Sequence, residues 1–216
     1  MSENDSGVVT AAQALERLKE GNQRFVTGDR SRDILVGLTR REQHLDGQRP
    51  IAVILGCSDS RVPVEIVFDQ GLGDLFVIRI AGNIVASSQI GSVEFAAQNF
   101  GTRLVVVLGH TGCGAVQATV DSLTANVKPE SEYVNMIVQR IKPSAKTVLD
   151  NAAHENREAL IDAAVRANVS AAANDLRHGS EILESLARDD GLLIVGAEYS
   201  LETGAVDFFD GAAPAG

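Results

Sequence analysis

The sequence predicts an α/β fold: a mainly parallel four-stranded sheet flanked by helices, with an antiparallel edge strand and an N-terminal helical arm. Four apolar runs are continuous rather than alternating, which is typical of parallel strands covered on both faces: residues 51–55, 75–78, 104–108 and 192–195. Helical stretches separate these runs, as crossovers between parallel strands require. A further run at 205–209 follows a Thr-Gly turn signal, so we expect it to pair antiparallel at the edge.

The first helix has a recognisable start. Thr10 and Gln13 have the spacing of a capping box, and an apolar stripe continues to Phe25 beyond a Gly-Asn interruption. The other expected helices cover residues 63–68, 88–99, 115–122 and a long region at 132–188 with breaks at Pro143 and Gly179. Residues 27–49 are polar and mixed, which indicates loop and a short helix.

The chain shows no internal repeat, linker or low-complexity tract. We therefore expect residues 1–216 to form a single domain, with residues 1–30 as its helical arm.

Composition excludes several classes of protein. With 44% hydrophobic and 22% charged residues, the 216-residue chain is not intrinsically disordered. A net charge of −10 disfavours nucleic acid as a partner, and no apolar run approaches the roughly 20 residues of a membrane span. Two cysteines are too few for a disulfide framework, and the polar N-terminus resembles no secretory signal. We therefore expect a cytoplasmic protein with no membrane partner.

Both cysteines follow an apolar run and a glycine. Cys57 follows the run at 51–55, and Cys113 follows the run at 104–108 in a Gly-His-Thr-Gly-Cys segment that includes His110. Sites in open α/β sheets form beyond the carboxyl ends of strands, so these three side chains are expected to meet. Two thiolates and an imidazole suit zinc and leave a fourth position open. The alternative is that each cysteine is simply a small buried packing residue.

Asp59 and Arg61 lie between the first cysteine and Pro63. Next to a metal, Asp59 can accept a hydrogen bond from a metal-bound hydroxide or occupy the open position itself, and Arg61 would hold it away through a bidentate pair. The alternative is a helix N-cap with a surface ion-pair partner.

The paired motifs resemble the β-class carbonic anhydrases. Residues 57–62 read Cys-Ser-Asp-Ser-Arg-Val, and residues 109–115 read Gly-His-Thr-Gly-Cys-Gly-Ala. The resemblance extends over nearly the whole chain, including residues 18–25, 76–83, 91–96 and 196–204. It implies a zinc enzyme that catalyses the reversible hydration of CO2 to bicarbonate and a proton by attack of zinc-bound hydroxide.

The resemblance also implies roles for individual residues. Cys57, His110 and Cys113 would bind zinc, and Asp59 with Arg61 would form a catalytic dyad, with Asp59 as a fourth ligand in a closed state at low pH. The residues implied in substrate binding are Gln48, Phe76, Ala81, Phe95 and Gly114. Without the resemblance, Gln48 reads as an exposed loop amide, and the apolar members of this set as ordinary core packing.

Family members form dimers by exchanging N-terminal helices and often pair dimers into tetramers, which implies a homodimer or homotetramer here. One branch carries an inhibitory bicarbonate site with a Trp three residues before the first ligand. That position is Ile54 in this chain, although Arg79 and Tyr199 match the rest of the site. For a proton shuttle, His44, His154 and His178 are possible by residue type alone.

Two other functions remain open from the sequence. A carbon disulfide or carbonyl sulfide hydrolase would use the same scaffold and zinc ligands. A non-catalytic zinc-stabilised module would need a fourth protein ligand, which Asp59 could supply. A nucleotide site at Gly71-Leu-Gly73 is rejected because a third glycine is missing and the glycines precede a strand.

Overall fold

The computed structural model describes residues 9–29, 41–42, 44–125, 127, 129, 131–151 and 156–212. Its centre is one sheet with the strand order β2-β1-β3-β4-β5. The strands are β1 (Ala52–Gly56), β2 (Leu75–Arg79), β3 (Leu104–His110), β4 (Leu193–Tyr199) and β5 (Val206–Asp210). The first four are parallel, and β5 pairs antiparallel with β4. The predicted fold class is confirmed.

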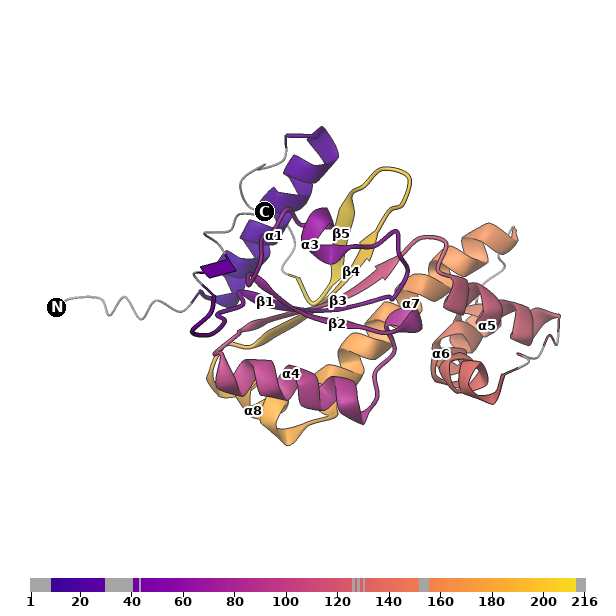
Figure 1. Ribbon diagram of the computed structural model, residues 1–216. Helices are drawn as coiled ribbons and strands as arrows, with labels where there is room; N and C mark the ends of the chain where they lie inside the picture. Colours follow the sequence, from indigo (N-terminus) through magenta and orange to yellow (C-terminus); the bar gives the residue numbers. More distant parts are fainter. Residues whose placement is uncertain are drawn as a thin grey trace.

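Helices cover both faces of this sheet (Figure 1). α1 (Ala11–Thr27) and α3 (Val64–Val67) lie on one face, and α4 (Ser87–Asn99), α7 (Arg157–His178) and α8 (Glu181–Asp189) lie on the other. α5 (Gly114–Thr124) and α6 (Glu132–Asn151) pack together with α7 beyond the end of β3. The short 3-10 helix η1 (Ala81–Asn83) follows β2.

The two central strands are buried on both faces, as their continuous apolar sequences predict. Every residue of β1 and β3 is buried, and successive side chains alternate between two cores. Ala52 and Ile54 pack under α1, whereas Val53 and Leu55 pack against α4 and α7. Polar groups at the carboxyl ends of these strands are therefore held on a rigid support.

The predicted start of α1 is confirmed. Thr10 and Gln13 form both hydrogen bonds of the capping box. The Gly-Asn step that interrupts the apolar stripe does not interrupt the helix, since α1 runs through Gly21 and Asn22 as predicted. Gly21 is needed because a Cβ there would lie 1.8 Å from the carbonyl oxygen of Phe68. This close approach seats α1 on the core of its own chain.

The long helical region divides differently from the prediction. Pro143 lies inside α6 rather than at a break. Packing of α6 against α5 and α7 outweighs the hydrogen bond that proline removes. The boundary falls instead between Asn151 and Asn156, whose side chain caps α7 by accepting a hydrogen bond from the N–H of Ala159. The predicted break at Gly179 is confirmed.

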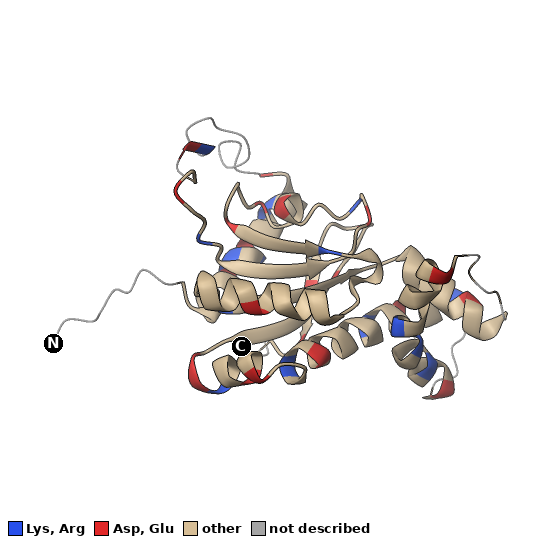
Figure 2. Cartoon of the chain, turned by 60° about the horizontal axis from the view of Figure 1, so that its bottom comes forward, with Lys and Arg blue, Asp and Glu red and all other residues tan. Residues whose placement is uncertain are grey.

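Charged residues lie mainly on the helices and connecting loops, and the central strands β1 and β3 contain no Lys, Arg, Asp or Glu (Figure 2). Among the residues described, no helix is long and apolar enough to cross a membrane.

Candidate metal centre

Three side chains meet beyond the carboxyl ends of two neighbouring strands. Cys57 directly follows β1, His110 ends β3, and Cys113 directly precedes α5. Their ligand atoms all lie within 4.8 Å of one another, and all three residues are buried. Gly112, with φ of 65°, makes the turn that brings Cys113 back beside His110. The predicted meeting of these three residues is confirmed.

The His110 ring is oriented by the backbone. Its Nδ1 lies 3.0 Å from the carbonyl oxygen of Thr111, a contact that requires the proton on Nδ1. In the neutral imidazole Nε2 then carries the lone pair, and this buried atom has no hydrogen-bond partner among the described residues. A buried acceptor without a partner costs free energy unless something binds it, so Nε2 is available to a cation.

The two thiols are electrostatically linked. Cys113 donates a hydrogen bond to Cys57, which lowers the pKa of Cys57 to about 4 against the opposing effect of burial. The His110 side chain and then the N–H groups of Gly82 and Asp59 also favour a Cys57 thiolate. The same pairing, together with burial, raises the pKa of Cys113. Both thiols can be thiolates together only if a cation compensates the second negative charge.

The donor set fits zinc. A tetrahedral ion with Zn–S distances near 2.3 Å and a Zn–N distance near 2.0 Å places its ligand atoms about 3.5–3.8 Å apart. The three ligand atoms of this chain lie within 4.8 Å of one another, so small side-chain movements would bring them to the separations that zinc requires. Two cysteines and one histidine leave one tetrahedral position without a protein ligand, which is the pattern of catalytic rather than structural zinc sites.

Asp59 lies at this open side, and Arg61 holds it. The guanidinium of Arg61 donates from Nε to Oδ1 at 2.9 Å and from Nη2 to Oδ2 at 2.7 Å. These bonds, which outweigh partial burial, keep the pKa of Asp59 well below its usual range. Asp59 Oδ2 is 3.9 Å from Nε2 of His110, so an ionised carboxylate borders the metal position. Asp59 does not cap α3, because the N-cap residue of that helix is Pro63 and no side chain caps it. Asp59 pairs with Arg61 instead.

Two residues that support the site were not assigned this role from the sequence. Gly82 donates its N–H to Cys57 Sγ at 3.3 Å, and a Cβ on Gly82 would lie 2.7 Å from Ile141 Cδ1. Arg79 donates to the backbone carbonyl oxygens of Cys57 and Asp59. The glycine in Ala81-Gly82, shortly after β2, was the sequence feature that could have indicated the Gly82 contact with Cys57. The Arg79 contacts depend on the pairing of β1 with β2, which no local pattern encodes.

The proposed substrate residues fall into two groups. Ala81 directly precedes Gly82, and Gly114 directly follows Cys113, with open space where its side chain would be. These two residues border the metal position. Gln48 is exposed and precedes β1, so the five residues of that strand, about 16 Å in length, separate it from Cys57.

Phe76 and Phe95 also lie away from the ligands of their own chain. Phe76 is paired in register with Val53, about 13 Å along the strand from Cys57. Its ring packs against Phe95 and Phe100 at centroid distances of 6.4 and 6.0 Å, and Phe95 is 50% exposed. These rings form a partly open aromatic cluster beside the edge strand β2.

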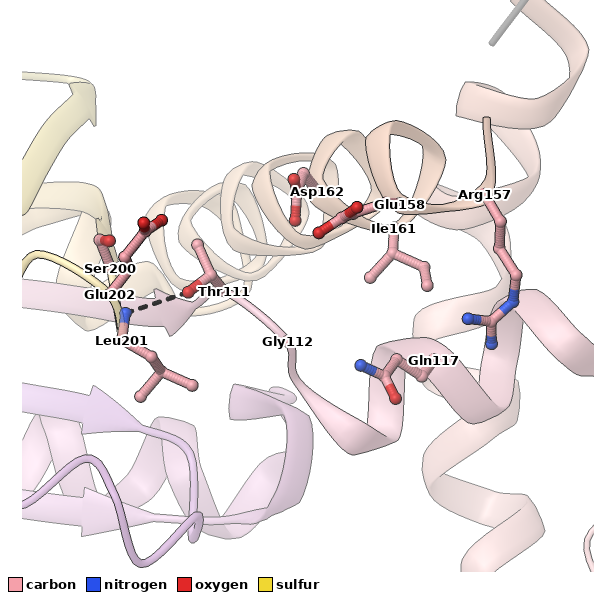
Figure 3. A pocket seen from close by; sticks show the side chains of 10 residues that line it. All are labelled: Thr111, Gly112, Gln117, Arg157, Glu158, Ile161, Asp162, Ser200, Leu201 and Glu202. Carbon is pink, nitrogen blue, oxygen red and sulfur yellow. Dashed lines mark hydrogen bonds between the residues drawn. The ribbon is translucent and has the colours of Figure 1, made fainter. Parts of the chain in front are cut away.

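A pocket of about 580 Å³ lies beside the ligand loop, the segment 111–112 between His110 and Cys113 (Figure 3). Thr111 and Gly112, which connect His110 to Cys113, form part of its wall. The N–H of Leu201 donates to Oγ1 of Thr111 at 3.0 Å, the dashed contact in the figure, and this bond ties the ligand loop to the segment after β4. The lining includes neither the three ligands nor Asp59.

Two positions of the inhibitory bicarbonate site, Ile54 in place of the Trp and the matching Tyr199, belong to the core. Ile54 is fully buried in the core under α1, and Tyr199 is nearly buried beside Phe25. Of the histidines considered for proton transfer, His44 packs against Gly73 and the side chain of His178 is 67% exposed. His154 lies outside the described residues.

The fold and site together define an α/β protein with a buried Cys-His-Cys cluster that could hold a metal ion, bordered by an Asp–Arg pair. Residues 52–206 match the family model described as carbonic anhydrase. Carbonic anhydrase 2 of Mycobacterium tuberculosis (strain H37Rv) is 38% identical over 193 residues, 88% of this chain and 89% of that protein. A carbonic anhydrase of Mycolicibacterium smegmatis is 47% identical over 131 residues, 61% of this chain and 63% of the relative.

Among solved structures, that of the β-carbonic anhydrase CcaA superposes with a TM-score of 0.72 at 30% identity, covering 91% of this chain and 95% of the other. The chain belongs to the carbonic anhydrase family and resembles its β class in sequence, fold and site.

Proposed function

We propose that this chain is a zinc-dependent carbonic anhydrase that catalyses the reversible hydration of CO2 to bicarbonate and a proton. The observation that carries the proposal is the Cys57–His110–Cys113 cluster, with the Asp59 carboxylate 3.9 Å from Nε2 of His110. Membership of the carbonic anhydrase family supports the same activity.

Cys57, His110 and Cys113 would hold the zinc ion, which when bound supplies Lewis-acid activation of a water molecule at neutral pH. Asp59 accepts a hydrogen bond from that nucleophile and orients it toward the substrate. Because its pKa lies well below the usual range, Asp59 is a weak base, so its role is orientation rather than storage of the proton. Arg61 fixes both carboxylate oxygens of Asp59, and the proton passes to buffer.

Substrate recognition needs a second copy of the chain. Ala81 and Gly114 border the metal position, and the N–H of Gly114 can approach an oxygen of the substrate closely. Gln48 and Phe95 lie far from the ligands of their own chain but are exposed, which supports a homodimer or homotetramer in which the partner subunit's Gln48 faces the site. The partner's Phe95 would supply part of an apolar CO2 pocket in the same assembly.

Two reduced thiols are needed as ligands, which fits a cytoplasmic location.

The activity is tested by stopped-flow CO2 hydration, with zinc determined on the same preparation. We expect hydration far above the uncatalysed rate in the zinc-loaded protein, and loss and recovery of activity on chelation and re-addition of zinc. Carbonyl sulfide is assayed in parallel. A zinc-loaded, folded protein that does not hydrate CO2 would contradict the proposal. If that protein hydrolysed carbonyl sulfide, the activity would be that of a carbonyl sulfide hydrolase.

A further inference from the structure

Arg79 is the last residue of β2, and its side chain crosses to the loop that carries the catalytic groups. The paired register of β1 and β2 ends at Gly56 and Arg79, where the N–H of Ile80 also donates to the carbonyl oxygen of Gly56 at 3.1 Å. Beyond Gly56 the chain leaves the sheet. The carbonyl groups of Cys57 and Asp59 therefore have no neighbouring strand to pair with.

The carbonyl oxygen of Asp59 accepts one backbone hydrogen bond, from the N–H of Val62 at 3.1 Å, and the guanidinium of Arg79 supplies further donors to this loop. Its Nε donates to the carbonyl oxygen of Cys57 at 3.1 Å, and its Nη2 donates to the carbonyl oxygen of Asp59 at 2.6 Å. Two donors on one edge of a planar group match two carbonyl oxygens that are two residues apart. A lysine would offer a single flexible donor point and could not hold both carbonyls in one geometry.

The segment held in this way carries three elements of the site. It includes the Cys57 thiol, the Asp59 N–H group that donates to that thiol, and the Asp59 carboxylate that borders the metal position. Arg61 fixes the carboxylate from the side-chain end. Arg79 fixes the backbone from the opposite side, so the two arginines restrain the same residue at different atoms.

We propose that Arg79 is a positioning residue for the reaction: it fixes the backbone from Cys57 to Asp59 so that the carboxylate and the thiolate keep their placement relative to each other. This inference rests on the proposed hydration of CO2. It differs from an effector-binding role, because the described contacts of the guanidinium are to the loop carbonyls, and Ile54 stands where an effector site would need its aromatic partner.

The test compares Arg79→Ala and Arg79→Lys with the wild type and with Arg188→Ala as the control. Arg188 is an exposed arginine in α8 that pairs with the adjacent Asp189. It is far from the site residues in sequence. In the zinc-loaded variants, we expect kcat to fall about 10- to 100-fold, as for other groups that orient a metal site, with KM for CO2 nearly unchanged. Guanidinium ion at sub-denaturing concentration is expected to restore part of the kcat of Arg79→Ala, and Arg79→Lys is expected to stay impaired.

A second measurement is independent of turnover. Each protein is loaded with Co²⁺, and the thiolate-to-cobalt absorption bands are recorded. We expect the bands to change in Arg79→Ala and Arg79→Lys but not in Arg188→Ala, because the Cys57 sulfur is no longer held in one position. If Arg79→Ala does not fold, Arg79→Lys, which keeps the charge and the aliphatic stem, decides both measurements.

Several outcomes would overturn the proposal. Unchanged kcat with loss of inhibition by added bicarbonate would make Arg79 an effector-binding residue. A fall in activity that matches only a fall in the folded fraction, with no rescue by guanidinium, would make its role purely structural. If the wild type fails to hydrate CO2, the proposed function fails, and the cobalt spectra alone judge the placement: altered bands support it and unaltered bands refute it.

Discussion

Two regions of this molecule hold buried polar groups whose hydrogen bonding differs: one on the inner face of α1, the other beyond β1 and β3. Under α1, Asn22 donates to the carbonyl oxygens of Val67 and Gly204 and accepts from the N–H of Val206. Beyond β1 and β3, Cys57 and Cys113 bond mainly to each other, and Nε2 of His110 has no hydrogen-bond partner among the described residues.

This difference in hydrogen bonding distinguishes polar groups that stabilise the fold from polar groups that can bind a ligand. The hydrogen-bonding capacity of Asn22 is used within the chain, so this residue contributes to folding. The ligand atoms beyond the strands, two sulfurs and Nε2 of His110, do not have their bonding capacity filled within the chain. Their arrangement therefore favours a bound ion. Four predictions test this contrast, in order of expected effect.

The largest effect is expected at the metal centre. His110→Gln removes the Nε2 donor while roughly keeping the side-chain volume. We expect zinc content to fall sharply and CO2 hydration to fall about 1,000-fold or more, since metal activation is worth several kcal/mol. The matched control is His178→Gln, an exposed histidine, and the measurements are zinc content and stopped-flow hydration. Full zinc and full activity in His110→Gln would contradict the ligand assignment.

A somewhat smaller effect is expected for the neighbouring carboxylate. Asp59→Asn keeps the shape of the side chain but weakens the hydrogen-bond acceptor that orients the nucleophile. We expect hydration to fall about 100-fold while zinc stays bound, within the usual range for a group that directs a proton in the transition state. Asp189→Asn is the control, because Asp189 also pairs with an arginine close to it in the chain, Arg188, but lies outside the site. Loss of zinc together with activity would instead make Asp59 a ligand.

The region under α1 is expected to respond in stability rather than activity. Asn22→Ala leaves two carbonyl groups and one N–H without their partner, so the free energy of unfolding should fall by about 2–3 kcal/mol. The hydration rate per bound zinc should be unchanged. Denaturant titration of Asn22→Ala beside Gln23→Ala, an exposed neighbour on the same helix, measures this effect. Equal stability of the two variants would remove the distinction between the regions.

The smallest effect concerns pH. The pKa of Asp59 is depressed in the folded chain, first by the hydrogen bonds from Arg61. Its stabilising contribution is therefore present above the ordinary carboxyl pKa near 4 and is lost as the pH falls toward the folded value. The melting temperature of the wild type should exceed that of Asp59→Asn by at most about 4 °C at pH 7, because the pair is partly exposed. The gap should begin to narrow below about pH 4 and close only as the pH approaches the depressed pKa of the folded chain. A gap that widens on acidification would reverse the sign assigned here.

The sequence was most informative where local patterns and chemistry coincide. Cys57, His110 and Cys113 each stand at the end of a continuous apolar run, so the rule that sites form at strand ends was enough to bring them together. The capping box at Thr10 depends only on residues three apart in the chain, whereas the cluster also needs β1 and β3 to be neighbours in the sheet, as they are.

The rest depended on contacts between distant segments. Nothing near Pro143 indicates that packing on α5 and α7 continues the helix through it, and nothing near Gly21 indicates the close approach of Phe68. The double hydrogen bond of Arg79 requires the register between β1 and β2. Gln48 shows a further limit, because its predicted role depends on a second copy of the chain.

The central claim is that one cation is held by two sulfurs and one imidazole with a position left open. X-ray absorption at the zinc edge of the purified, zinc-loaded protein tests it directly. We expect two sulfur neighbours at about 2.3 Å and two lighter neighbours, nitrogen or oxygen, at about 2.0–2.1 Å. A first shell without sulfur, or one with four sulfurs, would contradict the claim.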